Sequence, residues 1–344
     1  MTIYVDTNIL PRWGTLAAPH LAALLAVART TDHRLVLPAL VVEESVSARR
    51  RDAAAAFEAL GGAHKRASRY SDMVTTYIPS ADDVAAEWRD ELMGSFEVIE
   101  VPAEAASEAL RREANRQMPA REGRGGRDAA IWLTALREGV PDGDICHFLS
   151  ENTADFADPS EKTNLHPSLL SESEEAGKSI NYHASIDSLL GQLATPLRVT
   201  VSSEELLANS IVIDALRRAV DFDVLPRLNI KRADSGTQVT GEIYATAIIE
   251  ASSVRAKQSR AYEIEGQGYV LIFFDAELVT TVGVFTRRKG NPLETIVPIT
   301  LSISGRAWLT LDESSEAVVD AEIPYIDRVE AATPGAEFAP ILSR

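Results

Sequence analysis

Four acidic residues are the best candidates for chemistry in this sequence, because each follows a predicted strand or begins a predicted helix. Asp6 comes directly after a short run of β-forming residues, and Glu44 lies in the first turns of the helix after a second predicted strand. Asp128 begins a later helix, and Asp155 follows a further predicted strand. In a doubly wound sheet, strand ends and the helix starts that follow them share one rim. We therefore expect the four carboxylates to converge on one cleft.

Four carboxylates in one cleft imply a bound cation. Without one, their mutual repulsion would raise their pKa values. Hard divalent cations prefer oxygen ligands, which makes Mg²⁺ or Mn²⁺ the natural choice, bound as one ion or as two. The six histidines are scattered, and the single cysteine, Cys146, cannot build a cluster, so the sequence offers no competing site for a soft metal.

Each acid also has a structural alternative. Asp6 could simply cap the helix that follows it, since Asp favours that position. Glu43 and Glu44 are neighbours about 100° apart on a helix, so only one of them can face the cleft. Asp128 could interact with its own helix N-terminus, and Asp155 could be a turn residue in a polar loop.

The elements that would position these acids alternate between short strands and longer helices. This alternation is typical of a mainly parallel sheet covered on both faces, and we expect a Rossmann-like α/β domain over residues 1–195. Gly61 and Gly62 are expected to end its second helix. The predicted strands are 3–5, 34–37, 96–101, 145–149 and 180–183, and the predicted helices are 16–28, 38–60, 81–93, 104–117, 128–137 and 185–193.

Strands dominate after Pro196. One helix over residues 204–220 precedes segments that alternate with a two-residue period, so we expect a smaller antiparallel α+β domain over residues 196–344. Its sheet could form a homodimer, bind a protein partner or present RNA, and we assign it no site. Four of its aromatic residues are better explained as core than as stacking surfaces: Tyr262, Tyr269, Phe273 and Phe274. The predicted strands are 237–250, 269–274, 278–285, 295–303, 306–311 and 317–323.

Composition limits the classes of protein to which this chain can belong. A length of 344 residues suits two domains. The net charge of −17 argues against a protein that coats nucleic acid through general electrostatics. A single cysteine suits a reducing compartment. The sequence shows neither a signal-like N-terminal segment nor a long apolar run, so we expect a cytoplasmic protein without a membrane partner.

Two basic clusters suggest how an acidic protein could hold a polyanion. Between residues 111 and 127 there are six arginines and two acids, and this glycine-rich stretch leads directly into Asp128. Another cluster lies on the helix that carries Glu44. Such runs are often solvated faces, but their position beside two candidate metal ligands favours a role in binding nucleic acid. The candidate residues are Arg49, Arg50, Arg116, Arg121, Arg124 and Arg127.

The motifs around the four acids resemble those of the PIN domain (PilT N-terminus) family, in a version typical of longer bacterial PIN-like proteins. The resemblance covers about residues 1–195. It is carried by Glu44 after Pro38 and by three runs: Val5-Asp6-Thr7-Asn8, Gly126-Arg127-Asp128-Ala129-Ala130-Ile131-Trp132 and Leu149-Ser150-Glu151-Asn152-Thr153-Ala154-Asp155-Phe156. Each motif is short, but four in this order on a matching plan of strands and helices make a fairly specific signal.

The resemblance implies metal-dependent hydrolysis of phosphodiester bonds in RNA, usually single-stranded. It further implies that the metal is held by Asp6, Glu44, Asp128 and Asp155. The family's pattern favours Glu44 over Glu43. The resemblance also implies supporting roles for four polar residues: Thr7, Asn8, Ser150 and Asn152.

The leading hypothesis is therefore a divalent-metal-dependent endoribonuclease that uses a metal-activated water. A non-catalytic PIN-like module that acts through its C-terminal domain is the main alternative. A metal-dependent phosphatase is a third, although Asn8 stands where the D-x-D pattern of aspartyl-phosphate phosphatases requires a second Asp. The sequence leaves open whether the target is RNA or single-stranded DNA, and whether the role is that of a toxin, RNA processing or antiviral defence.

Overall fold

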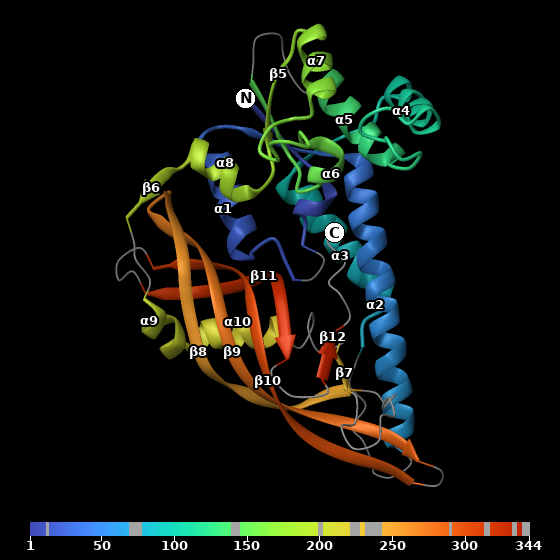
Figure 1. Ribbon diagram of the computed structural model, residues 1–344. Coiled ribbons are helices and arrows are strands. Elements are labelled where there is room, and N and C mark those ends of the chain that lie inside the picture. Colours follow the sequence, from blue (N-terminus) through green and yellow to red (C-terminus); the bar gives the residue numbers. More distant parts are fainter. Residues whose placement is uncertain are drawn as a thin grey trace. The chain divides into compact units, whose positions relative to one another are not determined.

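Figure 1 shows a computed structural model of the protein, which describes residues 1–11, 14–68, 78–138, 145–198, 202–220, 228–230, 243–288, 291–312, 317–331 and 336–338. The chain divides into two units. One comprises Met1–Ala17 and Leu24–Leu193, and the other comprises Ala18–Ala23 and Ala194–Arg344. Among the described residues, no helix has both the length and the apolar character needed to cross a membrane.

The first unit is built on a parallel sheet, which confirms the predicted fold class. Within the described residues this sheet has five strands in the order β3-β2-β1-β4-β5, each parallel to its neighbours. The apolar residues of the central strand β1 are at most 1% exposed, as expected of a strand covered on both faces. The strands are β1 (Thr2–Val5), β2 (Arg34–Pro38), β3 (Glu97–Ile99), β4 (Ile145–Leu149) and β5 (Ser179–His183).

The strand order places a topological switch point between β1 and β4. The chain moves outward from β1 through β2 to β3, and then returns to the other side of β1 with β4 and β5. Open α/β sheets bind ligands outside the carboxyl ends of the strands at such a point. Val5 at the end of β1 is paired with Leu149 at the end of β4. The residues that follow these two strands therefore lie where this fold places a ligand.

Helices connect the strands of the first unit. The second helix is longer than predicted, since α2 continues through Gly61 and Gly62 to Ala67. A glycine inside a helix reduces its stability by only about 1 kcal/mol, so two of them need not end it. The helical elements are η1 (Thr7–Ile9), α1 (Pro19–Thr30), α2 (Ala39–Ala67), α3 (Ala81–Ser95), α4 (Ala103–Asn115), α5 (Gly126–Glu138), α6 (Thr153–Phe156), α7 (Pro167–Glu175) and α8 (Ile186–Leu193).

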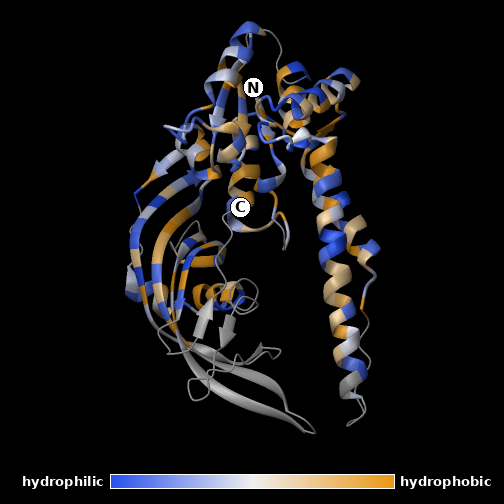
Figure 2. Cartoon of the chain, turned by 45° about the vertical axis from the view of Figure 1, so that its right-hand side comes forward, coloured by the Kyte–Doolittle hydropathy of each residue, from blue (hydrophilic) through white to orange (hydrophobic). Residues whose placement is uncertain are grey.

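The second unit contains an antiparallel sheet, again as predicted. Its described strands follow the order β11-β10-β9-β8-β6, and a separate pair joins β12 to β7. Figure 2 shows hydrophilic and hydrophobic residues alternating along the long strands. The strands are β6 (Thr195–Leu197), β7 (Leu228–Ile230), β8 (Ile243–Ile264), β9 (Gln267–Arg288), β10 (Asn291–Leu311), β11 (Val318–Ala331) and β12 (Ala336–Phe338).

Four predicted strands of this unit merge into two longer ones. The predicted strands 269–274 and 278–285 both lie in β9, and 295–303 and 306–311 both lie in β10. β9 runs through the predicted break at residues 275–277, and β10 runs through the one at residues 304–305. Asp275 stays in the ladder because the Ser304 hydroxyl donates to it at 2.7 Å and Lys257 pairs with it at 2.6 Å. A polar residue with partners on both neighbouring strands does not interrupt a sheet. The predicted strand start at residues 237–242 lies outside the described residues.

The predicted helix over residues 204–220 is two helices, α9 (Ser203–Ala208) and α10 (Ser210–Ala219). Asn209 separates them, because its side-chain oxygen accepts a hydrogen bond from the Ile211 backbone N–H at 2.9 Å and so caps α10. Apolar residues of α10 pack with alternate residues of β9 to form the core of this unit. Tyr262, Tyr269 and Phe274 are buried and Phe273 is half-buried, so these aromatics belong largely to the interior.

Candidate functional site

Asp6 lies at the switch point of the parallel sheet. Its backbone N–H donates to the Leu149 carbonyl at 3.0 Å, which ties the end of β1 to the end of β4. One carboxylate oxygen accepts from the Thr7 backbone N–H at 2.7 Å. The other accepts from the Ser150 hydroxyl at 2.6 Å and from the Asn8 amide at 2.9 Å. Asp6 thus caps the short helix η1, as the structural alternative anticipated, and it also belongs to a polar network across two strands.

The environment of Asp6 disfavours its charge. The side chain is buried, with 2% exposed, and this burial is the main reason that its pKa rises to about 7. Asp128 and Glu44 add repulsion that raises the pKa further, and the hydrogen bonds from Ser150 and Thr7 oppose the rise. A buried carboxylate with acidic neighbours is stabilised in its ionised form by a nearby cation.

Glu44, and not Glu43, faces the strand ends. The Thr7 hydroxyl donates to one Glu44 oxygen at 2.7 Å, and the Arg127 guanidinium pairs with the other. Glu43 points away and pairs with Arg89 at 2.6 Å, with its side chain 61% exposed. The two neighbours on α2 therefore face different surroundings, and Glu44 is the one that reaches the network around Asp6.

Asp128 and Asp155 share one amide. Asn152 donates to Asp128 at 3.3 Å and to Asp155 at 2.9 Å. Its own backbone N–H donates to the Ser150 hydroxyl at 3.1 Å, which connects this pair of acids to the network of Asp6. Burial raises the pKa of Asp128 to about 6, and the charges of Asp155 and Glu44 contribute to the rise.

Asp128 and Asp155 each lie near the beginning of a helix. Asp128 lies in the first turn of α5, which begins at Gly126 and so starts two residues before the predicted position. Asp155 lies in the short helix α6, and not in a loop. The structure therefore brings all four predicted acids, with Thr7, Asn8, Ser150 and Asn152, to one rim of the sheet.

The donor set at this rim consists of oxygen atoms, which suits a hard divalent cation. Among the described residues, however, no three acidic, histidine or cysteine side chains are arranged to hold a metal ion. The carboxylates instead contact hydroxyl, amide and guanidinium groups. Their chemistry fits Mg²⁺ or Mn²⁺, and their side chains would have to exchange partners to bind it.

The two candidate RNA-binding arginines of α2, Arg49 and Arg50, make packing and surface contacts. Arg49 donates to the Gly14 carbonyl at 2.7 Å, and its guanidinium lies 3.8 Å from the centre of the Trp88 ring. Burial lowers the pKa of Arg49. Arg50 pairs with Asp82 at 2.5 Å, and both side chains are exposed. These contacts tie α2 to its neighbours, and a role of either residue in binding nucleic acid stays a prediction.

The arginines between α4 and α5 are exposed. Arg116 ends α4 in a left-handed conformation with a φ of 54°, and Arg121 follows on the loop. Arg124 pairs with Glu122, two residues away, at 2.5 Å. This segment presents its guanidinium groups to solvent next to the start of α5, which carries Asp128.

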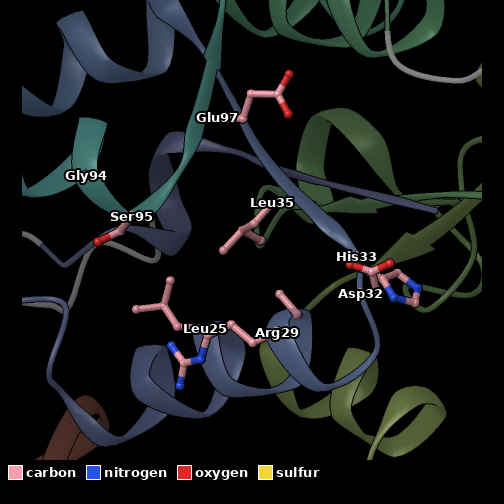
Figure 3. Close-up of a pocket in the computed structure, with 9 residues that line it drawn as sticks. Leu25, Arg29, Asp32, His33, Leu35, Gly94, Ser95 and Glu97 are labelled. Atoms are coloured by element: carbon pink, nitrogen blue, oxygen red, sulfur yellow. The ribbon is translucent and has the colours of Figure 1, made fainter.

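A pocket lies elsewhere in the first unit. It has a volume of about 580 Å³, and Figure 3 shows Leu25 and Arg29 from α1, Leu35 from β2 and Glu97 from β3 around it. Leu35 and Glu97 are near the amino ends of their strands, whereas the four acids follow carboxyl ends or lie on the helices after them. The pocket is therefore separate from the acidic rim.

Sequence reasoning missed residues that hold α5, the helix that carries Asp128, against its neighbours. The Glu113 carboxylate accepts from the Gly126 backbone N–H at 2.7 Å, at the beginning of α5. A Cβ at position 126 would displace the end of that flexible side chain, so this glycine was one signal of the contact. Arg112 is 9% exposed and pairs with Glu172, which also accepts from the Trp132 indole at 2.8 Å. The partners of Glu172 lie 40 and 60 residues away in the sequence, so no local pattern predicts these contacts.

Gly125 supplies a test of how Asp128 is positioned. Gly125 has a φ of +98°, and a Cβ there would lie 3.3 Å from a carboxylate oxygen of Asp128. Gly123 also has a positive φ, +73°, but its Cβ would make only ordinary contacts. We expect Gly123→Ala and Gly125→Ala each to lower the free energy of unfolding by about 1–2 kcal/mol.

Only Gly125→Ala should then disturb the acidic rim. Urea unfolding would measure the stability of both variants, and isothermal titration with Mn²⁺ would measure their metal affinity. We expect weaker Mn²⁺ binding in Gly125→Ala than in Gly123→Ala. Equal affinity in the two variants would contradict the inferred crowding of Asp128.

Comparison with known protein families identifies the N-terminal part of the chain. Residues 3–156 match a family model described as a PIN domain. No curated protein and no solved structure matches the chain. The matched range extends from β1 to the end of α6 and includes all four acids. The resemblance inferred from the motifs is confirmed, and residues 3–156 of this chain are therefore a PIN domain.

Proposed function

We propose that this protein is a divalent-metal-dependent endoribonuclease that acts on single-stranded RNA. PIN domains are generally nucleases. The observation that carries the proposal is the buried Asp6 carboxylate, whose pKa is raised to about 7 beside Glu44 and Asp128 at the switch point of the sheet. Four carboxylates this close together repel one another unless a cation is bound among them.

Asp6, Glu44, Asp128 and Asp155 would hold Mg²⁺ or Mn²⁺. When bound, the ion would supply a water of lowered pKa for attack on phosphorus and would neutralise charge on the phosphoryl oxygens. The protein's own contribution is to orient the carboxylates. Asn152 fixes Asp128 and Asp155 relative to each other.

Two further side chains orient the other acids. Ser150 fixes one oxygen of Asp6, and Thr7 fixes one oxygen of Glu44. Groups that orient metal ligands in this way commonly change metal affinity or activity by about 10–100-fold when they are removed. Thr7, Ser150 and Asn152 therefore take supporting roles in the proposal.

The exposed arginines before α5 support an RNA backbone as the substrate. The chain carries a net charge of −17, so a polyanion must be met by a local cationic surface. Arg116, Arg121 and Arg124 form such a surface on the segment that leads to Asp128. Phosphate contacts of this kind hold a strand without reading its sequence.

A digestion panel tests the proposed function. The full chain would be incubated with one labelled single-stranded RNA and with DNA of the same sequence, in Mg²⁺, in Mn²⁺ and in EDTA. We expect cleavage of RNA with either metal and none in EDTA, and we expect Asp128→Asn to lose cleavage while keeping its circular dichroism spectrum. Cleavage by a pure Asp128→Asn preparation at the wild-type rate would overturn the assignment. Binding of RNA without any cleavage would favour a non-catalytic module.

A further inference from the structure

One cationic side chain makes a direct contact with the acidic rim. The Arg127 guanidinium pairs with Glu44, and so joins α5 to α2. The Arg127 side chain is 73% exposed, whereas that of Glu44 is 17% exposed. Arg127 also directly precedes Asp128. The pair therefore has one end among the candidate metal ligands and the other end in solvent.

Both oxygens of Glu44 are engaged in this arrangement. Arg127 contacts one, and the Thr7 hydroxyl donates to the other at 2.7 Å. A hydroxyl donor orients a carboxylate without adding net charge. A guanidinium adds a full positive charge, which repels a divalent cation at the same carboxylate. Arg127 thus neutralises Glu44 and competes with a metal ion for it.

The exposure of Arg127 makes this contact easy to exchange. Water and salt screen the exposed guanidinium, so the pair contributes on the order of 1 kcal/mol although Glu44 is largely buried. The planar guanidinium also matches a phosphate group, with which it forms two parallel hydrogen bonds. Arg124, on the same segment, instead pairs with its near neighbour Glu122.

We infer that Arg127 exchanges partners during substrate binding, from Glu44 in the metal-free protein to an RNA phosphate once Glu44 has turned to a metal ion. This inference rests on the proposed function, since it takes Glu44 as a metal ligand. The exchange couples the two binding events. In the absence of phosphate, Arg127 weakens metal binding because it occupies Glu44. A bound metal ion releases Arg127, which can then bind a phosphate. By linkage, phosphate binding then strengthens metal binding to the same extent.

The first test compares metal affinities. Mn²⁺ would be titrated calorimetrically into the full-length wild type, Arg127→Gln and Arg124→Gln. We expect Arg127→Gln to bind Mn²⁺ about fivefold tighter than the wild type, because the competing charge is gone. Arg124→Gln removes the same charge from the same segment without touching Glu44, and should retain the wild-type Mn²⁺ affinity within about twofold.

The second test measures the coupling to phosphate. Adenosine 5′-monophosphate serves as the probe, because it carries a phosphate but has no diester bond to hydrolyse. We expect Mn²⁺ to tighten its binding to the wild type by about tenfold, and we expect Arg127→Gln to lose most of this gain. Arg127→Lys keeps the charge without the planar fork, and should retain part of the gain.

The outcomes separate this inference from the function itself. Mn²⁺ affinity in Arg127→Gln that equals or falls below that of the wild type would overturn the exchange. The exchange would also be overturned if Mn²⁺ tightened adenosine 5′-monophosphate binding to Arg127→Gln as much as to the wild type. If Mn²⁺ binds with the expected differences but no RNA is cleaved, the exchange holds and the ribonuclease proposal fails. If no protein of the series binds Mn²⁺, both proposals fall.

Discussion

Replacing Asp6 with asparagine is expected to reduce RNA cleavage more than about 100-fold, because it removes a proposed metal ligand and not merely a group that orients one. The same substitution should make the metal-free protein more stable at pH 8. Both effects have one origin, which is a carboxylate buried at the switch point of the sheet with Glu44 and Asp128 nearby. The charge is unfavourable for the fold alone, and the proposed metal site would use it.

The pH dependence of stability follows from the direction of the Asp6 shift. Its pKa rises from 3.8 to about 7 on folding. Protonated Asp6 therefore stabilises the fold fully below about pH 4, and this contribution is lost as the pH rises through 7. Asparagine does not titrate, so the gain in unfolding free energy of Asp6→Asn should grow between pH 4 and pH 8, towards about 4 kcal/mol. Chemical unfolding in EDTA at several pH values would measure it.

Asp158→Asn provides the matched control for Asp6→Asn. Asp158 follows α6 in the sequence, and hydrogen bonds from Ser160 lower its pKa, whereas the pKa of Asp6 is raised. We expect this variant to cleave RNA at the wild-type rate and to gain no stability at high pH. Normal RNA cleavage by Asp6→Asn would exclude Asp6 as a metal ligand, and lower stability than the wild type at pH 8 in EDTA would contradict an unfavourable buried charge.

Replacing Arg112 with methionine is expected to lower the free energy of unfolding by about 3–5 kcal/mol. The Arg112 guanidinium is almost fully buried, pairs with Glu172 and donates to the Met118 carbonyl at 3.1 Å. Removing one partner of a buried pair leaves the other charge without compensation. Glu172 would keep only the hydrogen bond from Trp132 among these contacts. Urea unfolding of the full chain would measure the loss.

Neighbouring residues supply the controls for Arg112→Met. Arg111 is the adjacent arginine of α4, but its side chain is 70% exposed in its pair with Glu108. We expect Arg111→Met to change the free energy of unfolding by less than about 0.5 kcal/mol. The double variant Arg112→Met/Glu172→Leu should recover part of the lost stability, because it leaves no unpaired charge. A mild Arg112→Met variant would contradict the role assigned to this buried pair.

Strand and helix patterns were sufficient to predict the parallel sheet and the rim that gathers the four acids. The reason is physical: the end of a buried strand is marked by a local change from apolar to polar residues, as at Val5-Asp6 and Leu149-Ser150. Once the strands are known to be parallel, their carboxyl ends must lie on one side. The side-chain oxygens of Asp6 and Ser150 could therefore be placed together without knowing any contact.

Contacts between distant elements could not be predicted in this way. The bonds of Glu113 to Gly126 and of Arg112 to Glu172 join residues on different helices, and their spacing has no characteristic period. The sequence also does not show which of two local conformations a residue will adopt. Asn209 could continue a helix or cap one, and its capping hydrogen bonds decided the outcome. The position of the Arg49 guanidinium over the Trp88 ring could not be predicted from the sequence either.

The position of β1 at the centre of its sheet has a consequence for synthesis of the protein. β1 is made first, but the strand on its other side, β4, follows about 140 residues later. At ordinary rates of translation this interval lasts on the order of ten seconds. During that time Asp6 lacks both Ser150 and the carbonyl of Leu149. The network around Asp6 therefore cannot assemble until the chain has been made through Ser150.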